Sequence, residues 1–142
     1  MKLLLLSFVI SLHLYSAVDF ILPIFDNKKT YSIKSDLNRK QVVINFWASW
    51  CTTCIEEIPL LNQLYERYKM KDYQFIAINA GEKDFKIKKF LKKYSFKFLI
   101  IKDKNREISK KLGVTKLPKT IIIDKNGKII YNKERPPQNF SF

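Results

Sequence analysis

The hydrophobic residues of this chain fall into short blocks whose spacing switches between strand-like and helix-like patterns. Residues 42–47 (VVINFW) form a continuous β-branched and aromatic run, which predicts a buried strand. From Cys51 to about Tyr68 the apolar residues recur at helical spacing, which predicts an amphipathic helix. Residues 75–79 (FIAIN) predict a second strand. The first half of the chain is therefore predicted to run strand, helix, strand.

A lysine-rich segment follows, and its pattern is again helical. Residues 85–94 predict a helix with an apolar inner face and a lysine-rich outer face. Residues 98–101 (FLII) predict an extended segment, and residues 107–112 predict a short helix that Gly113 ends. The inner face of the 85–94 helix is expected to carry Ile87, Phe90, Leu91 and Tyr94, and its outer face Lys86, Lys89, Lys92 and Lys93.

Two strands, 120–123 and 128–131, end the patterned part of the chain. The Asn126-Gly127 pair between them is a strong hairpin signal. Strands joined through helices imply parallel pairing in a central sheet, to which the hairpin adds antiparallel strands at one side. The predicted fold class is α/β, with a central mixed β-sheet and flanking helices. Residues 132–142 contain two prolines and no helical stripe, so they predict an irregular tail.

The composition indicates one folded domain. The chain has 142 residues and is 46% hydrophobic, with only three glycines and five prolines, a composition that argues against a disordered chain. Two cysteines exclude a four-cysteine zinc or iron–sulfur site. The single histidine, His13, lies in the first apolar run, so no histidine-based catalytic pair is expected in a domain that lacks this run.

The net charge is strongly positive, with 27 basic and 13 acidic residues giving +14. Such a balance suits nucleic acid, a lipid surface or an acidic protein. Lysine supplies nearly all of the positive charge, whereas sites that clamp phosphates or contact bases favour arginine. We therefore interpret the charge as a solvated lysine surface and expect no nucleic-acid partner.

The first seventeen residues have the layout of a secretory signal. Lys2 precedes the mostly apolar run 3–14, which is shorter than a membrane-spanning helix, and small residues follow at Ser16 and Ala17. Cleavage after Ala17 is expected, although Tyr15 stands where a small residue is preferred, so an uncleaved N-terminal anchor is the alternative. Both interpretations predict an exported domain at 18–142.

The two cysteines stand three positions apart, at the predicted step from a strand into a helix. A disulfide that closes so short a loop removes little entropy from the unfolded chain, so a redox pair makes better physical sense than a structural staple. The free N–H groups and dipole of a helix N-terminus favour a thiolate at Cys51, and Cys54 is placed to resolve a mixed disulfide. Ile55 replaces the histidine that a c-type haem site requires. Two inert core cysteines remain the alternative.

Residues 45–54 (NFWASWCTTC) resemble the active-site stretch of the thioredoxin superfamily, and more narrowly the exported TlpA/ResA/CcmG-type thiol–disulfide oxidoreductases. Pro59 matches the proline inside that family's active-site helix, and Leu117-Pro118 matches its cis-proline dipeptide. Residues 76–82 and 123–128 are also similar to family segments. The likeness covers roughly residues 19–131.

This resemblance implies a thioredoxin-like fold with a cis bond before Pro118. It implies catalytic roles for Cys51, Cys54 and a proton-handling Glu57, without cofactor or metal. Trp50, Leu117, Pro118 and Glu82 are expected to bind substrate. The family's usual C-terminal helix has no counterpart here, so some apolar surface of the sheet is expected to be exposed.

The function expected on these grounds is reduction of disulfides in client proteins. Thr52 and Thr53 lack positive charge and Glu57 adds negative charge, so all three disfavour the thiolate and predict a reducing pair. The family suggests apocytochrome c as client, a membrane electron donor of the CcdA/DsbD kind, and a location in the periplasm or on the outer face of the cytoplasmic membrane. Residues 1–17 would supply any membrane attachment. The alternatives are a general exported thiol oxidant or isomerase and a non-enzymatic client-binding module.

Overall fold

The computed structural model of the protein describes residues 18–141, so the predicted signal or anchor at 1–17 lies outside the described residues. Seven strands, three α-helices and one 3-10 helix make up this part of the chain. In chain order they are β1 (Ile21–Pro23), β2 (Thr30–Ser32), the 3-10 helix η1 (Ile33–Ser35), β3 (Gln41–Trp47), α1 (Thr52–Tyr68), β4 (Tyr73–Ala80), α2 (Asp84–Leu91), β5 (Leu99–Asp103), α3 (Glu107–Lys111), β6 (Lys119–Ile123) and β7 (Ile129–Lys133).

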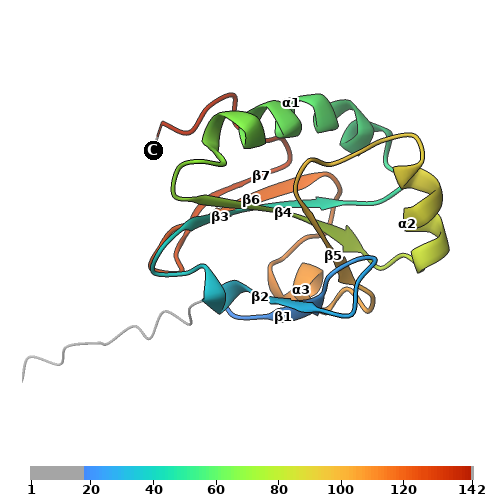
Figure 1. Ribbon diagram of the computed structural model, residues 1–142, viewed down its shortest axis with the longest axis horizontal. Coiled ribbons are helices and arrows are strands. Elements are labelled where there is room, and N and C mark those ends of the chain that lie inside the picture. Colours follow the sequence, from blue (N-terminus) through green and yellow to red (C-terminus); the bar gives the residue numbers. More distant parts are fainter. Residues whose placement is uncertain (1–17, 142) are drawn as a thin grey trace, which may run out of the picture.

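Five of the strands form a mixed sheet in the order β5-β4-β3-β6-β7 (Figure 1). β3, β4 and β5 run parallel, whereas β6 is antiparallel to both β3 and β7. The predicted fold class, with its parallel pair and added hairpin, is therefore confirmed. The extended segment predicted at 98–101 is the edge strand β5, a third parallel strand. This sheet with its flanking helices is the architecture of a thioredoxin-like fold.

The central strand β3 is buried on both faces, which explains its continuous apolar sequence. Alternate residues point to opposite faces. Val43 and Trp47 contribute to the core on one side, and Val42, Ile44 and Phe46 contribute to the core on the other. The strand is thus held firmly up to Trp47, from which the chain turns towards the cysteines.

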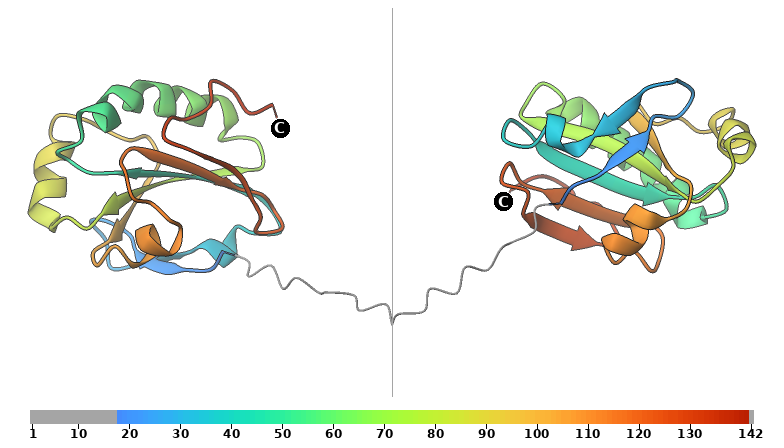
Figure 2. Two further views of the ribbon diagram at one scale, coloured as in Figure 1. Left: turned by 180° about the vertical axis from the view of Figure 1, so that it is seen from behind. Right: turned by 90° about the horizontal axis from the view of Figure 1, so that it is seen from below.

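Helices α1 and α2 cover one face of the sheet (Figures 1 and 2). The stripe that the periodicity predicts on α1 is Ile58, Leu61, Tyr65 and Tyr68, with Leu64 beside it. Of these residues Ile58, Leu61, Leu64 and Tyr68 are buried, and Tyr65 is partly buried against the same core. Phe90 of α2 packs on Trp47 with ring centroids 4.7 Å apart. The two helices therefore fix the strand that leads to the cysteine pair.

The opposite face is covered by a β1–β2 hairpin, η1 and α3 (Figure 2). The sequence pattern did not predict the hairpin, because its strands have three residues each and show no alternation that could be distinguished from a loop. The chain just after β1 also contacts the sheet edge. The Phe25 backbone N–H donates to the Ile100 carbonyl at 2.9 Å, and Ile24 bridges Ile101.

Helix α2 is shorter than predicted, and the inward position expected for Tyr94 is wrong. The helix ends at Leu91, and Tyr94 is 38% exposed. The chain leaves the helix here because Asn62 of α1 holds the next loop: its side chain donates to the Ser95 carbonyl and accepts from the Lys97 N–H, both at 2.9 Å. This turn brings Phe96, rather than Tyr94, onto Trp47, with ring centroids 5.1 Å apart.

The tail after β7 is irregular, as predicted: residues 134–141 form no helix. It nevertheless returns along α1 (Figure 1). The Phe140 ring lies 4.5 Å from the Tyr68 ring and 4.9 Å from the Tyr73 ring, and its backbone N–H donates to the Tyr68 hydroxyl at 3.2 Å. Phe140 and Tyr131 therefore pack against this core. They cover apolar surface that was expected to be exposed because the usual C-terminal helix has no counterpart here.

Candidate functional site

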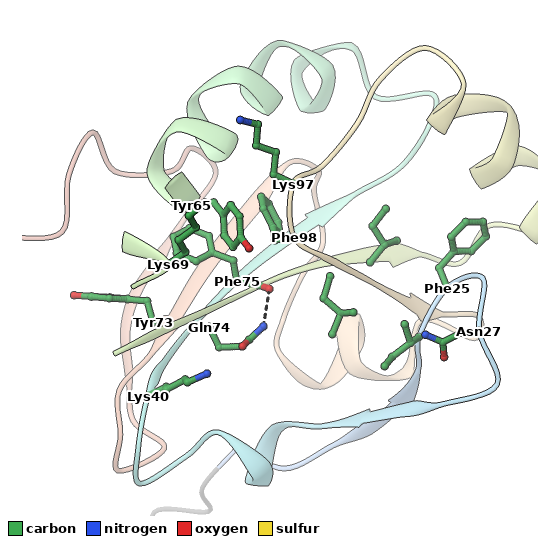
Figure 3. Close-up of a pocket in the computed structure, with 13 residues that line it drawn as sticks. Phe25, Asn27, Lys40, Tyr65, Lys69, Tyr73, Gln74, Phe75, Lys97 and Phe98 are labelled. Carbon is green, nitrogen blue, oxygen red and sulfur yellow. Dashed lines mark hydrogen bonds between the residues drawn. The ribbon is translucent and has the colours of Figure 1, made fainter. Parts of the chain in front are cut away.

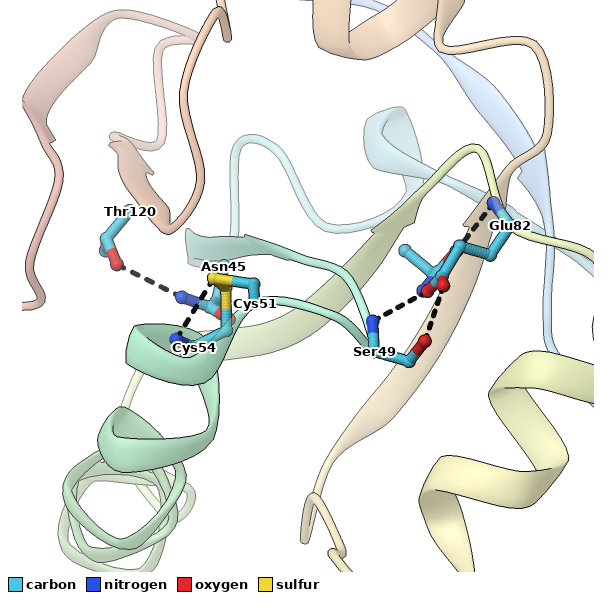
Figure 4. Close-up of a disulfide and its surroundings, with 7 residues drawn as sticks. Asn45, Ser49, Cys51, Cys54, Glu82 and Thr120 are labelled. Atoms are coloured by element: carbon cyan, nitrogen blue, oxygen red, sulfur yellow. Dashed lines mark hydrogen bonds between the residues drawn. A yellow bond between two sulfur atoms is a disulfide. The ribbon is translucent and has the colours of Figure 1, made fainter.

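The two cysteines lie at the start of α1 and are joined in a disulfide (Figure 4). Cys51 is the N-cap of the helix, and its Cα lies 5.2 Å from that of Cys54. Strand β3 ends four residues earlier, so the chain makes one short turn from the buried strand to the first sulfur. The predicted strand–turn–helix position of the pair is confirmed.

The first sulfur is held by the helix backbone. The Cys54 N–H donates to the Cys51 Sγ at 3.2 Å, so a free N–H of the first helical turn is directed at this atom. Cys51 is 5% exposed and Cys54 2%, while the preceding Trp50 is 69% exposed. A sulfur at the N-cap is stabilised as a thiolate, and a second sulfur one turn later can close on it. This arrangement can exchange two electrons reversibly between a dithiol and a disulfide.

The cis bond predicted before Pro118 is confirmed. Pro118 directly precedes β6, whose first residue, Lys119, pairs with Phe46 near the end of β3. The Asn45 side chain also donates to the Thr120 hydroxyl at 3.4 Å across these strands (Figure 4). Pro118 is buried at the sheet end that leads to the cysteines, and Leu117 is partly buried. Their roles in substrate binding stay predictions.

Glu82 holds the turn that precedes Cys51. Its carboxylate accepts from the Ser49 N–H at 2.7 Å, from the Ser49 hydroxyl, and from the Asn79 side chain at 2.8 Å (Figure 4). The side-chain Oδ1 of Asn79 in turn accepts from the Glu82 N–H at 3.1 Å. The carboxylate is therefore bound by the chain itself and fixes the active-site turn to the end of β4. Its expected part in substrate binding stays a prediction.

Glu57 lies one turn after Cys54, three positions along the same helix, and so on the same helix face. It is 3% exposed, and within residues 18–141 neither carboxyl oxygen has a hydrogen-bond partner. Burial raises the pKa of Glu57 to about 7, although Arg135 opposes the rise, and Glu56 adds to it. At neutral pH this carboxyl can both hold and accept a proton.

Arg135 is the residue of this site that sequence reasoning missed. It lies in the irregular tail, where no pattern relates it to α1. The Tyr131 hydroxyl donates to the Arg135 carbonyl at 2.7 Å, which folds the tail back after β7. Burial raises the pKa of Tyr131, and the charge of Glu57 adds to the rise. The tail thus brings the Arg135 guanidinium, and β7 the Tyr131 phenol, near the buried carboxyl.

The raised pKa of Glu57 predicts a pH-dependent stability. Folding favours the protonated carboxyl, so this stabilisation is fully present below pH 4.5, the ordinary value, and is lost as the pH rises through about 7. We expect the free energy of unfolding of the oxidised protein to fall by on the order of 2 kcal/mol across this window. In Glu57→Gln the fall should be absent. Urea unfolding at several pH values measures it, and equal pH slopes in both proteins would contradict the prediction.

Arg135→Ala supplies a second variant for this measurement. Because the guanidinium holds the Glu57 pKa down, its removal should move the midpoint of the stability loss to higher pH. Arg67→Ala, an exposed arginine on the far end of α1, is the matched control and should leave the midpoint in place. If the parent protein, Arg135→Ala and Arg67→Ala all lose stability at the same pH midpoint, the tail does not act on Glu57.

Hollows of about 460, 570 and 350 Å³ open on the surface of residues 18–141. The first, which we call the α2 groove, has a volume of about 460 Å³ and lies between the active-site turn and α2; its lining includes Trp50, Ile55, Phe85 and Lys89. The second has about 570 Å³ and follows β4 and β5 from the end of α1, at Tyr65, to the loop after β1 (Figure 3). Of these two hollows, the α2 groove is the one lined by Trp50 and Ile55, the residues that flank the two cysteines in the chain.

Neither a metal cluster nor a membrane span is present in the described part of the chain. Across residues 18–141, no three His, Cys, Asp or Glu side chains gather as a metal-binding group. No helix in the same range is long and apolar enough to cross a membrane.

The Redoxin family profile matches residues 16–141 of the chain. The sequence is 42% identical over 114 residues to the thiol-disulfide oxidoreductase ResA of Bacillus thuringiensis subsp. konkukian (strain 97-27), a match that covers 80% of this chain and 65% of the relative. The chain thus spans slightly less than two thirds of the length of that relative.

Solved structures show the same fold. A chain described as a DsbE thiol:disulfide interchange protein from Chlorobium tepidum superposes with a TM-score of 0.77 at 30% identity, covering 85% of this chain and 84% of the other. The exposed lipoprotein thioredoxin of Streptococcus pneumoniae strain TIGR4 gives a TM-score of 0.72 at 26% identity, covering 84% and 91%. The predicted resemblance to ResA- and CcmG-type proteins is confirmed by these similarities.

Proposed function

Because the chain belongs to the Redoxin family, we propose that it is an exported thiol–disulfide oxidoreductase that reduces disulfides in client proteins. The observation that carries this proposal is the Cys51–Cys54 pair at the N-terminus of α1, with a helix N–H directed at the first sulfur. The similarity to a relative named as a thiol-disulfide oxidoreductase supports the same chemistry. Catalysis then needs only the two sulfurs, a proton acceptor and a surface that holds the client.

The reaction begins with the reduced pair. The Cys51 thiolate attacks one sulfur of the client disulfide, so a Cys51–client bond forms as the client S–S bond breaks. The released client sulfur leaves as a thiolate and takes up a proton. The N-terminal dipole of α1 and the Cys54 N–H stabilise the negative charge on Cys51 before the attack.

In the second step the pair closes. Cys54 loses its proton and attacks the Cys51 sulfur, which forms the intramolecular disulfide and expels the second client sulfur as a thiolate. Two electrons have then passed from the protein to the client. Glu57 is the proposed acceptor of the Cys54 proton, because it is buried one turn away on the same face and its pKa is raised to about 7. Leu117 and Pro118 are proposed to hold the client backbone during both steps.

The proposed direction of electron flow is reduction of the client. Strong oxidants of this chemistry stabilise their reduced thiolate. Here the residues between the cysteines, Thr52 and Thr53, are neutral, and the buried Glu57 destabilises a neighbouring negative charge when it is ionised. Both features favour a pair that gives electrons away.

The proposed clients are exported proteins with cysteine pairs, among them apocytochrome c before haem attachment. The oxidised pair must then be reduced again by a dithiol donor, for which a membrane protein of the CcdA/DsbD kind is proposed. The proposed location is the periplasm or the outer face of the cytoplasmic membrane, with residues 1–17 as signal or anchor. The similar protein from Streptococcus pneumoniae, which is named as an exposed lipoprotein, supports the location.

The equilibrium reduction potential of the Cys51–Cys54 pair tests the proposal. The protein is equilibrated in buffers of graded thiol and disulfide content, and free thiols are trapped by alkylation and counted by mass. We expect a potential well below about −200 mV, in the range of reducing proteins of this chemistry. A value near about −120 mV would identify an oxidant or isomerase instead. If no reversible pair forms, the protein is a client-binding module rather than an enzyme.

A further inference from the structure

The α2 groove combines exposed aromatic rings with lysines that make no ion pair within residues 18–141. Phe85 is 62% exposed and Trp50 69%, although rings of this size are usually buried. Both line the groove, together with Tyr94, whose outward position was not predicted. The groove therefore offers apolar surface within reach of a polypeptide that approaches Cys51.

Three lysines border this apolar surface. Lys86, Lys89 and Lys93 follow one another at intervals of three and four, so they share one side of α2 and its C-terminal extension. All three are exposed, and within residues 18–141 none of them makes an ion pair. By contrast, Lys88 on the other side of the helix pairs with Asp26 at 3.8 Å.

The single acidic group that lines the groove does not neutralise these lysines. It is Glu82, which is 9% exposed and whose carboxylate accepts hydrogen bonds from Ser49 and Asn79. The neighbouring Asp84 is bound by Lys102 at 3.1 Å. The groove consequently presents a positive rim around an apolar floor, which complements negative charge placed beside an apolar group.

We propose that the α2 groove binds the client polypeptide beside its reacting disulfide and selects segments in which acidic side chains neighbour an aromatic or aliphatic one. This inference rests on the proposed function and adds the class of substrate to it. Trp50 and Ile55 flank the cysteine pair along the chain and also line the groove, so a segment seated there continues directly to Cys51. A volume of about 460 Å³ falls in the range of sites that enclose several side chains or a small ligand.

Three disulfides test the proposal with the reduced full-length protein. Two are peptides that each contain one disulfide and a phenylalanine next to it, and they differ only in two flanking residues, which are aspartates in one and lysines in the other. The third is hydroxyethyl disulfide, which is neutral and too small to reach α2. We expect the rate constant for the acidic peptide to exceed that for the basic peptide by about tenfold at low salt, with the ratio shrinking at about 0.5 M salt.

Matched variants assign the preference to the groove. The triple substitution K86E/K89E/K93E should reverse the preference, and K86Q/K89Q/K93Q should bring the two rates together. K28E/K110E/K128E changes the net charge equally at exposed lysines outside the three hollows and should retain most of the preference. Unchanged rates with hydroxyethyl disulfide show that each variant keeps its fold and its sulfur chemistry.

The outcomes separate the two proposals. If the parent protein reduces none of the three disulfides, the proposed function fails and the substrate class fails with it. If it reduces all three but treats the two peptides alike, the function stands and the groove proposal is overturned. The groove proposal is also overturned if K86E/K89E/K93E and K28E/K110E/K128E lose the preference for the acidic peptide equally. The net charge of the protein alone would then account for that preference.

Discussion

Cys51→Ser will lower the rate of client disulfide reduction by on the order of a thousandfold or more, because a serine hydroxyl does not replace a thiolate as nucleophile at neutral pH. Cys51 is the helix N-cap, and a serine oxygen can accept the Cys54 N–H in its place, so the fold is expected to persist. The measurement is single-turnover reduction of a peptide disulfide by the protein after its own reduction. Full activity of Cys51→Ser would remove the proposed mechanism.

Cys54→Ser is expected to behave differently, which makes it the informative partner variant. Cys51 can still attack, but the buried second sulfur that expels the client is missing. The variant should therefore accumulate a stable Cys51–client mixed disulfide, visible as a single added mass that thiol reagents remove. The double variant Cys51→Ser/Cys54→Ser is the control and should form no adduct. If the adduct forms on Cys54 in Cys51→Ser instead, the two roles are reversed.

Glu82→Ala will destabilise the protein by about 3 kcal/mol, because it removes one buried acceptor and leaves several donors without a partner. The donors are the Ser49 N–H, the Ser49 hydroxyl and the Asn79 side-chain amide. The measurement is the free energy of unfolding in urea at pH 7. Glu134→Ala, at an exposed position in the tail, is the matched control and should lie close to the parent protein.

Glu82→Ala should also slow the chemistry in the protein that remains folded. The same carboxylate fixes the turn at Ser49, two residues before Cys51. A turn released from β4 no longer holds Cys51 at the first N–H groups of α1, so the rate with hydroxyethyl disulfide should fall. A variant that unfolds at the same urea concentration as the parent and reacts at the same rate would show that the three hydrogen bonds carry no net stabilisation.

The central part of the fold was predictable because its signals are local and strong. The run at 42–47 is short, continuous, and rich in β-branched and aromatic residues, which indicates a strand buried on both faces, and the stripe of α1 repeats over several turns. The cysteine pair between them was predictable for the same reason, since its position depends only on these two neighbours. The Asn126-Gly127 turn likewise fixed the β6–β7 hairpin.

The remaining features depend on contacts between distant parts of the chain, which no local pattern records. Tyr94 has the right spacing for an inward residue, yet Asn62 pulls the following loop across α1 and Phe96 takes the inner place. Arg135 and Phe140 stand in a segment without periodicity, and only the folded tail brings them to α1. Side-chain roles at the edge of the site therefore required the tertiary structure.

The order of the strands in the sheet also dictates when this protein can acquire its shape. β3 is the first strand of the sheet to be synthesised, yet Asn45 finds its partner Thr120 75 positions later, and Tyr68 binds Phe140 72 positions later. Contacts of this span close only after a long loop has formed, and they make folding slow. A chain that emerges from a ribosome or a secretion channel N-terminus first therefore remains open until residues 119–133 are out. Until then the apolar β3 and both thiols are accessible to chaperones and to foreign disulfides, so the nascent protein is itself a substrate for the kind of exchange it is proposed to perform.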